Sequence, residues 1–153
     1  MRFDSWQFRM SQPSPVRYKR VVLKLSGEVL REPGSRDSIH PEIVARIATQ
    51  VAEAQKLGVE LAIVKLGAEG VMLATATERI RIAPYKIKLV CGLGSGDAFG
   101  GALAHGLIHD WPVQQIGEFA NAAGAYVATK LTCADAMPTE PMLRDFIAEQ
   151  QKI

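Results

Sequence analysis

Three glycines at alternating positions constrain the fold of this chain more than any other sequence feature. They lie in the run CGLGSGDAF, from Cys91 to Phe99, between an apolar segment and a segment with helical spacing. Without Cβ atoms, the backbone N–H groups of such a run can approach an anion closely. A helix beginning near Gly96 directs its positive end to the same place. The run therefore predicts a phosphate site between a strand and a helix of an α/β protein.

The run differs from two common phosphate-binding motifs. No Gly-Lys-Ser/Thr follows it, as a Walker A loop requires, and Asp97 and Phe99 stand where the dinucleotide fingerprint needs a further glycine. Asp97 is the informative residue, because a carboxylate in the first turn of a phosphate-binding helix repels a resting phosphate. It either caps the helix or accepts the proton of a hydroxyl that attacks a γ-phosphorus. The residues alone leave both alternatives open.

The segments before the glycine run alternate between strand and helix patterns. Apolar, β-branched runs predict strands at Arg20–Leu25 and Val59–Val64. Apolar residues at helical spacing predict a helix between them, from Pro41 to Leu57, ended by Gly58. Such a strand–helix–strand unit is expected to form a parallel pair with a right-handed crossover.

The remaining patterns complete a layered architecture. A hairpin is predicted from Gly70–Thr75 and Arg79–Ala83, with a further strand at Lys86–Val90. Helices are predicted at Gly96–His109, Val113–Lys130 and Thr139–Gln150, with Trp111-Pro112 as a break and Thr139 as an N-cap. The order predicts an α/β fold, a three-layer sandwich with a mostly parallel sheet plus a β-hairpin.

Composition excludes several classes of protein. The chain has 153 residues, 48% of them hydrophobic and 22% charged, which is typical of one folded domain. A net charge of +2 and the lack of a long apolar run argue against nucleic-acid or membrane partners. Residues 1–17 are predicted to be a flexible leader without secretory features, and residues 18–153 a single nucleotide-binding domain. With two cysteines at no metal-binding spacing, the chain is predicted to be cytoplasmic and without a protein-bound metal site.

Four segments resemble one family in order and spacing. GSGDAFGGAL, from Gly94 to Leu103, resembles the C-terminal signature of the ribokinase-like (PfkB) carbohydrate kinases. VKLGAEGVML, FANAAGAYVA and CADAMPTE match segments that flank this signature in the family. The resemblance covers residues 59–141. It implies a truncated, ribokinase-like C-terminal part of a kinase that uses ATP and Mg²⁺ to phosphorylate a sugar or sugar-acid hydroxyl.

Carried over to this chain, the resemblance makes Asp97 the catalytic base. The anion hole would comprise Gly94, Ser95 and Gly96. One departure is Cys91, where the family usually has Asn or Asp, because a thiol replaces an amide or carboxylate hydrogen bond poorly.

The same resemblance implies residues around the nucleotide. Lys65 and Gly67 would border it, and Asn121 would lie by the adenine. Ala125 and residues 133–135 would fall near a monovalent-cation site, so a monovalent cation joins ATP and Mg²⁺ among the implied cofactors.

The start of the chain resembles a different family. YKRVVLKLSGE, from Tyr18 to Glu28, and the helix and strand that follow resemble the opening of bacterial UMP kinases, of the amino-acid-kinase family. Lys24, Ser26 and Gly27 would then lie at the phosphates. The glycine-rich segment expected after the second strand is replaced by KLGAEGV. The chain is therefore interpreted as chimeric, with a UMP-kinase-like start at 18–58 and a ribokinase-like part at 59–153.

Three functions follow from these patterns. The first is a PfkB-type carbohydrate kinase, or a fragment of one, with Asp97 as base. The second is a nucleotide-binding module or remnant without turnover, because the family's acceptor-binding residues lie mainly in parts that this chain lacks. The third is UMP-kinase-like phosphotransfer. Whether the isolated chain is an active enzyme stays open, and a homo-oligomer would supply missing surfaces.

Several residues with reactive side chains have simpler interpretations. His105 and His109 lie four residues apart on one predicted helix, but no third metal ligand is apparent, so a structural or surface role is favoured. Trp111 is interpreted as a packing residue at the helix junction, and Cys133 as a small buried hydrophobic residue.

Overall fold

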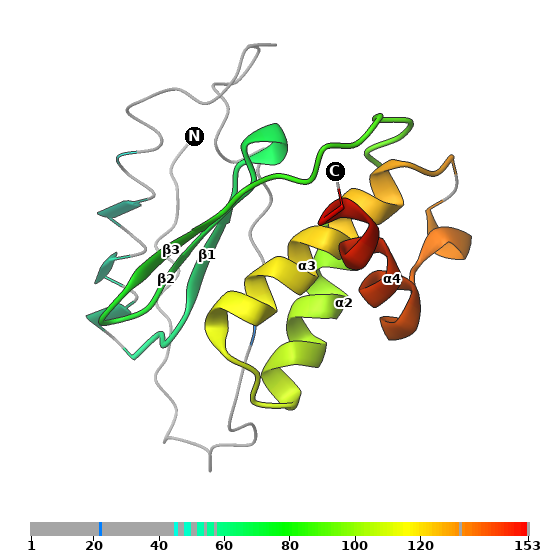
Figure 1. Cartoon of the computed structure of the whole chain (residues 1–153). Helices are drawn as coiled ribbons and strands as arrows, with labels where there is room; N and C mark the ends of the chain where they lie inside the picture. The colour runs from blue at the N-terminus through cyan, green and yellow to red at the C-terminus, as the bar shows by residue number, and fades with distance from the viewer. Residues whose placement is uncertain are drawn as a thin grey trace, which may run out of the picture.

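The computed structural model describes residues 58–131 and 133–152, together with positions 22, 45, 48, 49, 52, 53, 55 and 56. The elements in chain order are β1 (Ala62–Lys65), η2 (Gly67–Glu69), β2 (Val71–Ala74), β3 (Arg79–Ile82), α2 (Ser95–Ile108), α3 (Val113–Ala128), η3 (Ala134–Ala136) and α4 (Glu140–Gln150). Figure 1 shows the sheet on one side of the α2–α3 pair and α4 on the other.

The strands of the described part form one antiparallel sheet in the order β1-β2-β3. Val71 pairs with Ile82 across the predicted hairpin, which is confirmed. The strand expected at Val59–Val64 begins three residues later and pairs antiparallel with β2. Of its expected parallel partner, Arg20–Leu25, only Val22 is described, so the mostly parallel sheet stays a prediction.

The prediction of a strand at Lys86–Val90 is wrong. Residues 83–89 form no strand, although their apolar residues partly alternate. Pro84 has no N–H to donate to a strand partner. At the far end of the segment, the N–H groups of Val90 and Cys91 donate to the carbonyl of Ala128 in α3, at 2.8 and 3.1 Å. The segment therefore crosses from sheet to helix layer without joining the sheet (Figure 1).

The helix expected from Pro41 to Leu57 is confirmed at every one of its positions that the structure describes. Gly58 ends it with φ of 101°, and its N–H donates to the carbonyl of Gln55 at 3.0 Å. The Gln55 amide in turn donates to the carbonyl of Ala74 at 3.2 Å, which ties this helix to the end of β2. The leader at 1–17 lies outside the described residues.

The main core lies between the sheet and the α2–α3 pair. Leu73 of β2 is fully buried and contacts α3 at Gly117, where a Cβ would lie only 2.7 Å from its Cδ1. The helices themselves pack through small residues and two phenylalanines, Phe99 and Phe119, both nearly buried. Leu143 buries α4 against the same core. The three predicted C-terminal helices are therefore confirmed, within two residues at each boundary.

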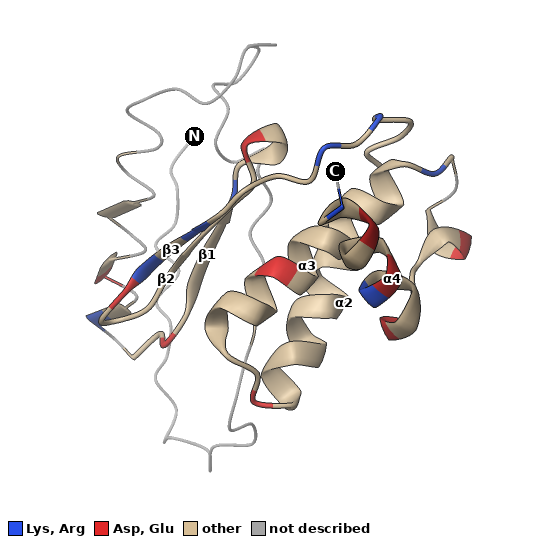
Figure 2. Ribbon diagram, viewed as in Figure 1, with Lys and Arg blue, Asp and Glu red and all other residues tan. Residues whose placement is uncertain are grey.

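Charges are sparse on the helix pair. Asp97 is the acidic residue of α2 and Glu118 that of α3, whereas the strands carry basic residues, Lys65 on β1 and Arg79 and Arg81 on β3 (Figure 2). There Arg81 pairs with Glu69 at 3.4 Å on the surface. None of the described helices is both long and apolar enough to cross a bilayer.

Candidate functional site

The glycine run forms the sharp turn into α2 that the sequence predicted. Gly94 is the N-cap residue, with φ of 81°, a left-handed conformation that glycine adopts without a Cβ penalty. Its carbonyl accepts from the N–H groups of Asp97 and Ala98 at 3.0 and 2.9 Å. No side chain caps this helix end. The backbone N–H groups of the first turn therefore find hydrogen-bond acceptors in nearby backbone or in a bound ligand.

Two contacts hold the run in place. On one side, the bonds from Val90 and Cys91 anchor it to the end of α3. On the other side, Cys133 packs so closely on Gly94 that a Cβ added there would clash with its Sγ. Cys133 is half-buried and not fully buried as expected. In the sequence, only the match of the segment CADAMPTE to the family pointed to this region. The interpretation of Cys133 as a small buried hydrophobic residue did not predict its contact with Gly94.

Helix α3 approaches the start of α2 closely. A Cβ at Gly124 would lie 3.2 Å from the carbonyl oxygen of Ser95, so the lack of a Cβ at this position permits the close approach. The Ser95 Oγ is buried and has no hydrogen-bond partner among the described residues. A buried hydroxyl without a partner is uncommon and marks a place for a water, an ion or a ligand atom. The donor set here thus fits an anion, and the sequence did not predict this hydroxyl's burial.

Lys65 reaches the same helix end from the C-terminus of β1. Its Nζ lies 3.0 Å from the position that a Cβ on Gly96 would occupy, and 5.5 Å from the centre of the Phe99 ring. The N–H of Gly96 has no acceptor within the described part of the chain. The ammonium and the positive end of the helix therefore meet at Gly96. A phosphate oxygen between them would be attracted by both.

Asp97 does not cap the helix, since Gly94 occupies the N-cap position. Its carboxylate lies in the first turn of α2 on an exposed residue, where it is available to a solute. Of the two alternatives that the sequence left open, N-capping is therefore excluded by the geometry. The role of Asp97 as a base stays a prediction.

The other predicted nucleotide residues are less closely placed. Gly67 lies in η2, with φ of 59° and open space where a Cβ would be, directly after β1. Asn121 donates from Nδ2 to the carbonyl of Ala83 at 2.9 Å and so ties α3 to the end of β3. Its place by an adenine stays a prediction. Lys24 and Gly27 lie outside the described residues.

The glycine run lies apart from two hollows beside α4. One hollow, of about 260 Å³, lies between α3 and α4, and the other, of about 390 Å³, lies between residues 82–86, α3 and α4. No residue of the glycine run lines either hollow. No group of three or more metal-ligating side chains occurs in the described part, which includes His105 and His109. The described residues at the start of α2 therefore offer hydrogen-bond donors and one exposed carboxylate.

Solved structures share this fold. A ribokinase of Arabidopsis thaliana, solved with ribose and ATP, is 27% identical with a TM-score of 0.60, covering 67% of this chain and 34% of that one. A protein of Escherichia coli described as a ribokinase II, solved with ATP and Mg²⁺, is 28% identical with a TM-score of 0.64, covering 80% of this chain and 37% of that one. The fold class is therefore ribokinase-like.

The family follows from the sequence match. Residues 33–140 match the model of the pfkB family carbohydrate kinases, which is more than half of the chain. The chain belongs to the pfkB family. A 5-dehydro-2-deoxygluconokinase of Clostridium botulinum is 27% identical over 139 residues, covering 88% of this chain. This chain spans 41% of that relative's length. The family match begins at residue 33, upstream of residue 59 where the resemblance in the sequence begins.

Proposed function

We propose that the glycine run and Lys65 bind the phosphates of ATP, in the nucleotide-binding part of an ATP-dependent carbohydrate kinase. The observation that carries this proposal is the convergence of the Lys65 ammonium and the N-terminus of α2 at Gly96. The buried Ser95 hydroxyl adds a donor at the same helix end. Family membership supports the assignment to a kinase. The choice of ATP as the nucleotide is supported by the two similar structures that were solved with ATP.

The chemistry proposed for this chain is proton acceptance and charge stabilisation. Asp97 accepts the proton of the acceptor hydroxyl while that oxygen bonds to the γ-phosphorus and ADP leaves. The N–H groups of Gly94 and Gly96, the Ser95 hydroxyl and the Lys65 ammonium stabilise charge on the transferring phosphoryl group. The Ser95 N–H itself donates to the carbonyl of Gly92 at 3.3 Å. Because the described residues offer no three-ligand metal group, Mg²⁺ would be held through phosphate oxygens and water. A monovalent cation near residues 133–135 remains part of the proposal.

The acceptor class is a sugar-acid hydroxyl. The run GLGSGDAFGGALAHGL, with FANAAGA and CADAMPTE, looks most like 5-dehydro-2-deoxygluconokinase, and the Clostridium botulinum relative bears that name. Acceptor contacts from a second copy of the chain also belong to this proposal.

A nucleotide-binding module without turnover is the second candidate. Asp97 is exposed, and no residue of the glycine run lines either of the two hollows beside α4, which favours this candidate. UMP-kinase-like phosphotransfer rests on Lys24 and Gly27, outside the described residues, and nothing in the described part favours it. The first two candidates share a nucleotide site and differ in phosphoryl transfer alone.

Thermal unfolding with and without MgATP tests the nucleotide site. At about one hundred times its dissociation constant, MgATP is expected to add about 2.7 kcal/mol to the folding free energy. Lys65→Met should lose most of that gain. Lys152→Met, with the same loss of charge just beyond α4, should keep it. An equal gain in wild type and both variants would show that Lys65 does not bind the nucleotide. No gain in any of the three proteins would reject the proposal. Gain without transfer to any sugar acid would favour the second candidate.

A further inference from the structure

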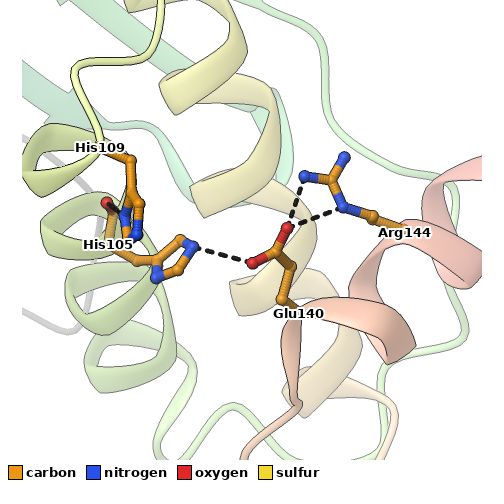
Figure 3. Close-up of polar contacts among 4 residues, drawn as sticks. All are labelled: His105, His109, Glu140 and Arg144. Atoms are coloured by element: carbon orange, nitrogen blue, oxygen red, sulfur yellow. Dashed lines mark hydrogen bonds and ion pairs between the residues drawn. The ribbon is translucent and has the colours of Figure 1, made fainter.

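A second polar network lies at the opposite end of α2 (Figure 3). The Nε2 of His105 donates to the Oε2 of Glu140 at 3.0 Å, and the Nε of Arg144 donates to its Oε1 at 2.9 Å. The His105 and Glu140 side chains are 33% and 36% exposed, so the bond between them is partly shielded from water. It joins the last turn of α2 to the first residue of α4.

The oxygen atoms that face His105 and His109 determine which ring nitrogens carry a hydrogen. The hydrogen bond from Arg144 lowers the pKa of Glu140, so the carboxylate is ionised at neutral pH and can only accept. The Nε2 of His105 must therefore carry a hydrogen. On the other side, the Nδ1 of His109 donates to the backbone carbonyl of His105 at 2.8 Å.

Aromatic packing fixes the His105 ring. Trp111 meets it edge-on at 5.2 Å between ring centres, and Phe119 of α3 lies at 6.1 Å. The guanidinium of Arg144 lies over the Trp111 ring at 5.5 Å, which adds a cation–π contact between α4 and the helix junction. His105 therefore presents its Nε2 to Glu140 in a fixed direction.

The chain segment that ends at Glu140 also contacts the other end of α2. It begins at Cys133, which packs on Gly94 at the N-cap. Between them lies the short helix η3, closed by a bond from the N–H of Met137 to the carbonyl of Ala134 at 3.3 Å. The segment from Cys133 to Glu140, called here the strap, is thus attached to α2 at both ends of that helix.

We infer that the strap positions the glycine run, and that His105 and Glu140 are positioning residues that act on it through Cys133. The left-handed conformation of Gly94 has no side-chain cap, and the Cys133 side chain contacts it directly. The position of Cys133 is set by a short segment whose far end His105 holds. The competing explanation is that buried Leu143 alone docks α4, and that Glu140 belongs to an inconsequential surface ion pair.

Amide hydrogen exchange on the full chain without nucleotide distinguishes these explanations. His105→Phe keeps the ring and removes the donor to Glu140. We expect exchange to become about two- to fivefold faster at residues 92–97 as well as 133–139, the range of a modest ion pair. Glu140→Ala should do the same, and Glu140→Gln, which keeps an acceptor oxygen, should restore most of the protection. Ile108→Ala, at a 69% exposed position on the same helix, is the control and should leave residues 92–97 unchanged.

Faster exchange confined to residues 105–109 and 140–144 in both His105→Phe and Glu140→Ala would overturn the inference. So would a Glu140→Gln variant as unprotected at 92–97 as Glu140→Ala. If His105→Phe does not fold, the two Glu140 variants decide the result. The affinity for MgATP should also weaken about two- to fivefold in His105→Phe. That last readout rests on the proposed function, whereas the exchange measurement stands without it.

Discussion

The two ends of α2 differ in how their polar groups are satisfied. At its start, the glycine run leaves the first turn without a side-chain cap, and an exposed carboxylate and a lysine ammonium lie beside it. At its end, His105 contacts both Trp111 and Glu140. We propose that the first end binds an external anion, whereas the second end holds α2 to α4. Substitutions at the two ends should separate function from folding.

The largest effect is expected on phosphoryl transfer from Asp97→Asn. An amide cannot accept the hydroxyl proton, so transfer to a sugar-acid acceptor should fall about 10²- to 10⁴-fold, with the unfolding midpoint unchanged. Steady-state kinetics and thermal unfolding measure the two quantities. Asp110→Asn, an identical change at the far end of α2, is the matched control and should leave transfer unaltered. Equal losses in both variants would contradict a base role for Asp97.

At the other end, Phe119→Ala should cost about 3–5 kcal/mol of unfolding free energy. The ring is 5% exposed and meets Trp111 edge-on at 5.1 Å, so its removal leaves a cavity at the helix junction. Urea unfolding measures the loss. Leu93→Ala, in the glycine run but 71% exposed, should change stability by less than about 0.5 kcal/mol. A comparable loss in both would mean that the glycine run is also a core element.

Local sequence patterns predicted the helices well because their apolar positions and breakers are local. Helix α2 was expected at Gly96–His109 and is found at Ser95–Ile108, and Trp111-Pro112 separates it from α3 as expected. The same local argument fails at Lys86–Val90. A strand needs a partner that sequence alternation cannot supply, and this segment instead gives hydrogen bonds to α3.

The site was predictable to the extent that one run of residues defines it. Gly94, Ser95, Gly96 and Asp97 are adjacent in sequence, so their common helix end followed from the motif. The approach of Lys65 came from family resemblance, because no spacing rule relates it to Gly96. The Cys133 contact with Gly94 is long-range packing between segments, and reading Cys133 by residue type alone placed it in the core.

Gly94→Ala should destabilise the chain by about 2–4 kcal/mol. The left-handed φ of 81° costs an L-residue roughly 1–2 kcal/mol, and the Cβ would clash with the Cys133 Sγ. Urea unfolding of the double variant with Cys133→Ala should recover the part due to the clash. Gly101→Ala, at a helical position with open space for a Cβ, should stabilise by about 0.5–1 kcal/mol. A neutral Gly94→Ala would show that the N-cap tolerates rearrangement.

The smallest expected effect is the pH dependence contributed by Glu140. The Arg144 hydrogen bond lowers its folded-state pKa below the ordinary value of 4.5. The resulting stabilisation is therefore complete above pH 4.5 and is lost as pH falls through the lower folded-state pKa. Urea unfolding of wild type and Glu140→Gln between pH 3 and 6 should show a difference that shrinks toward acid. Glu149→Gln, further along α4, is the matched control. A difference constant with pH would mean that Glu140 stabilises the end of α2 by packing alone, without its charge.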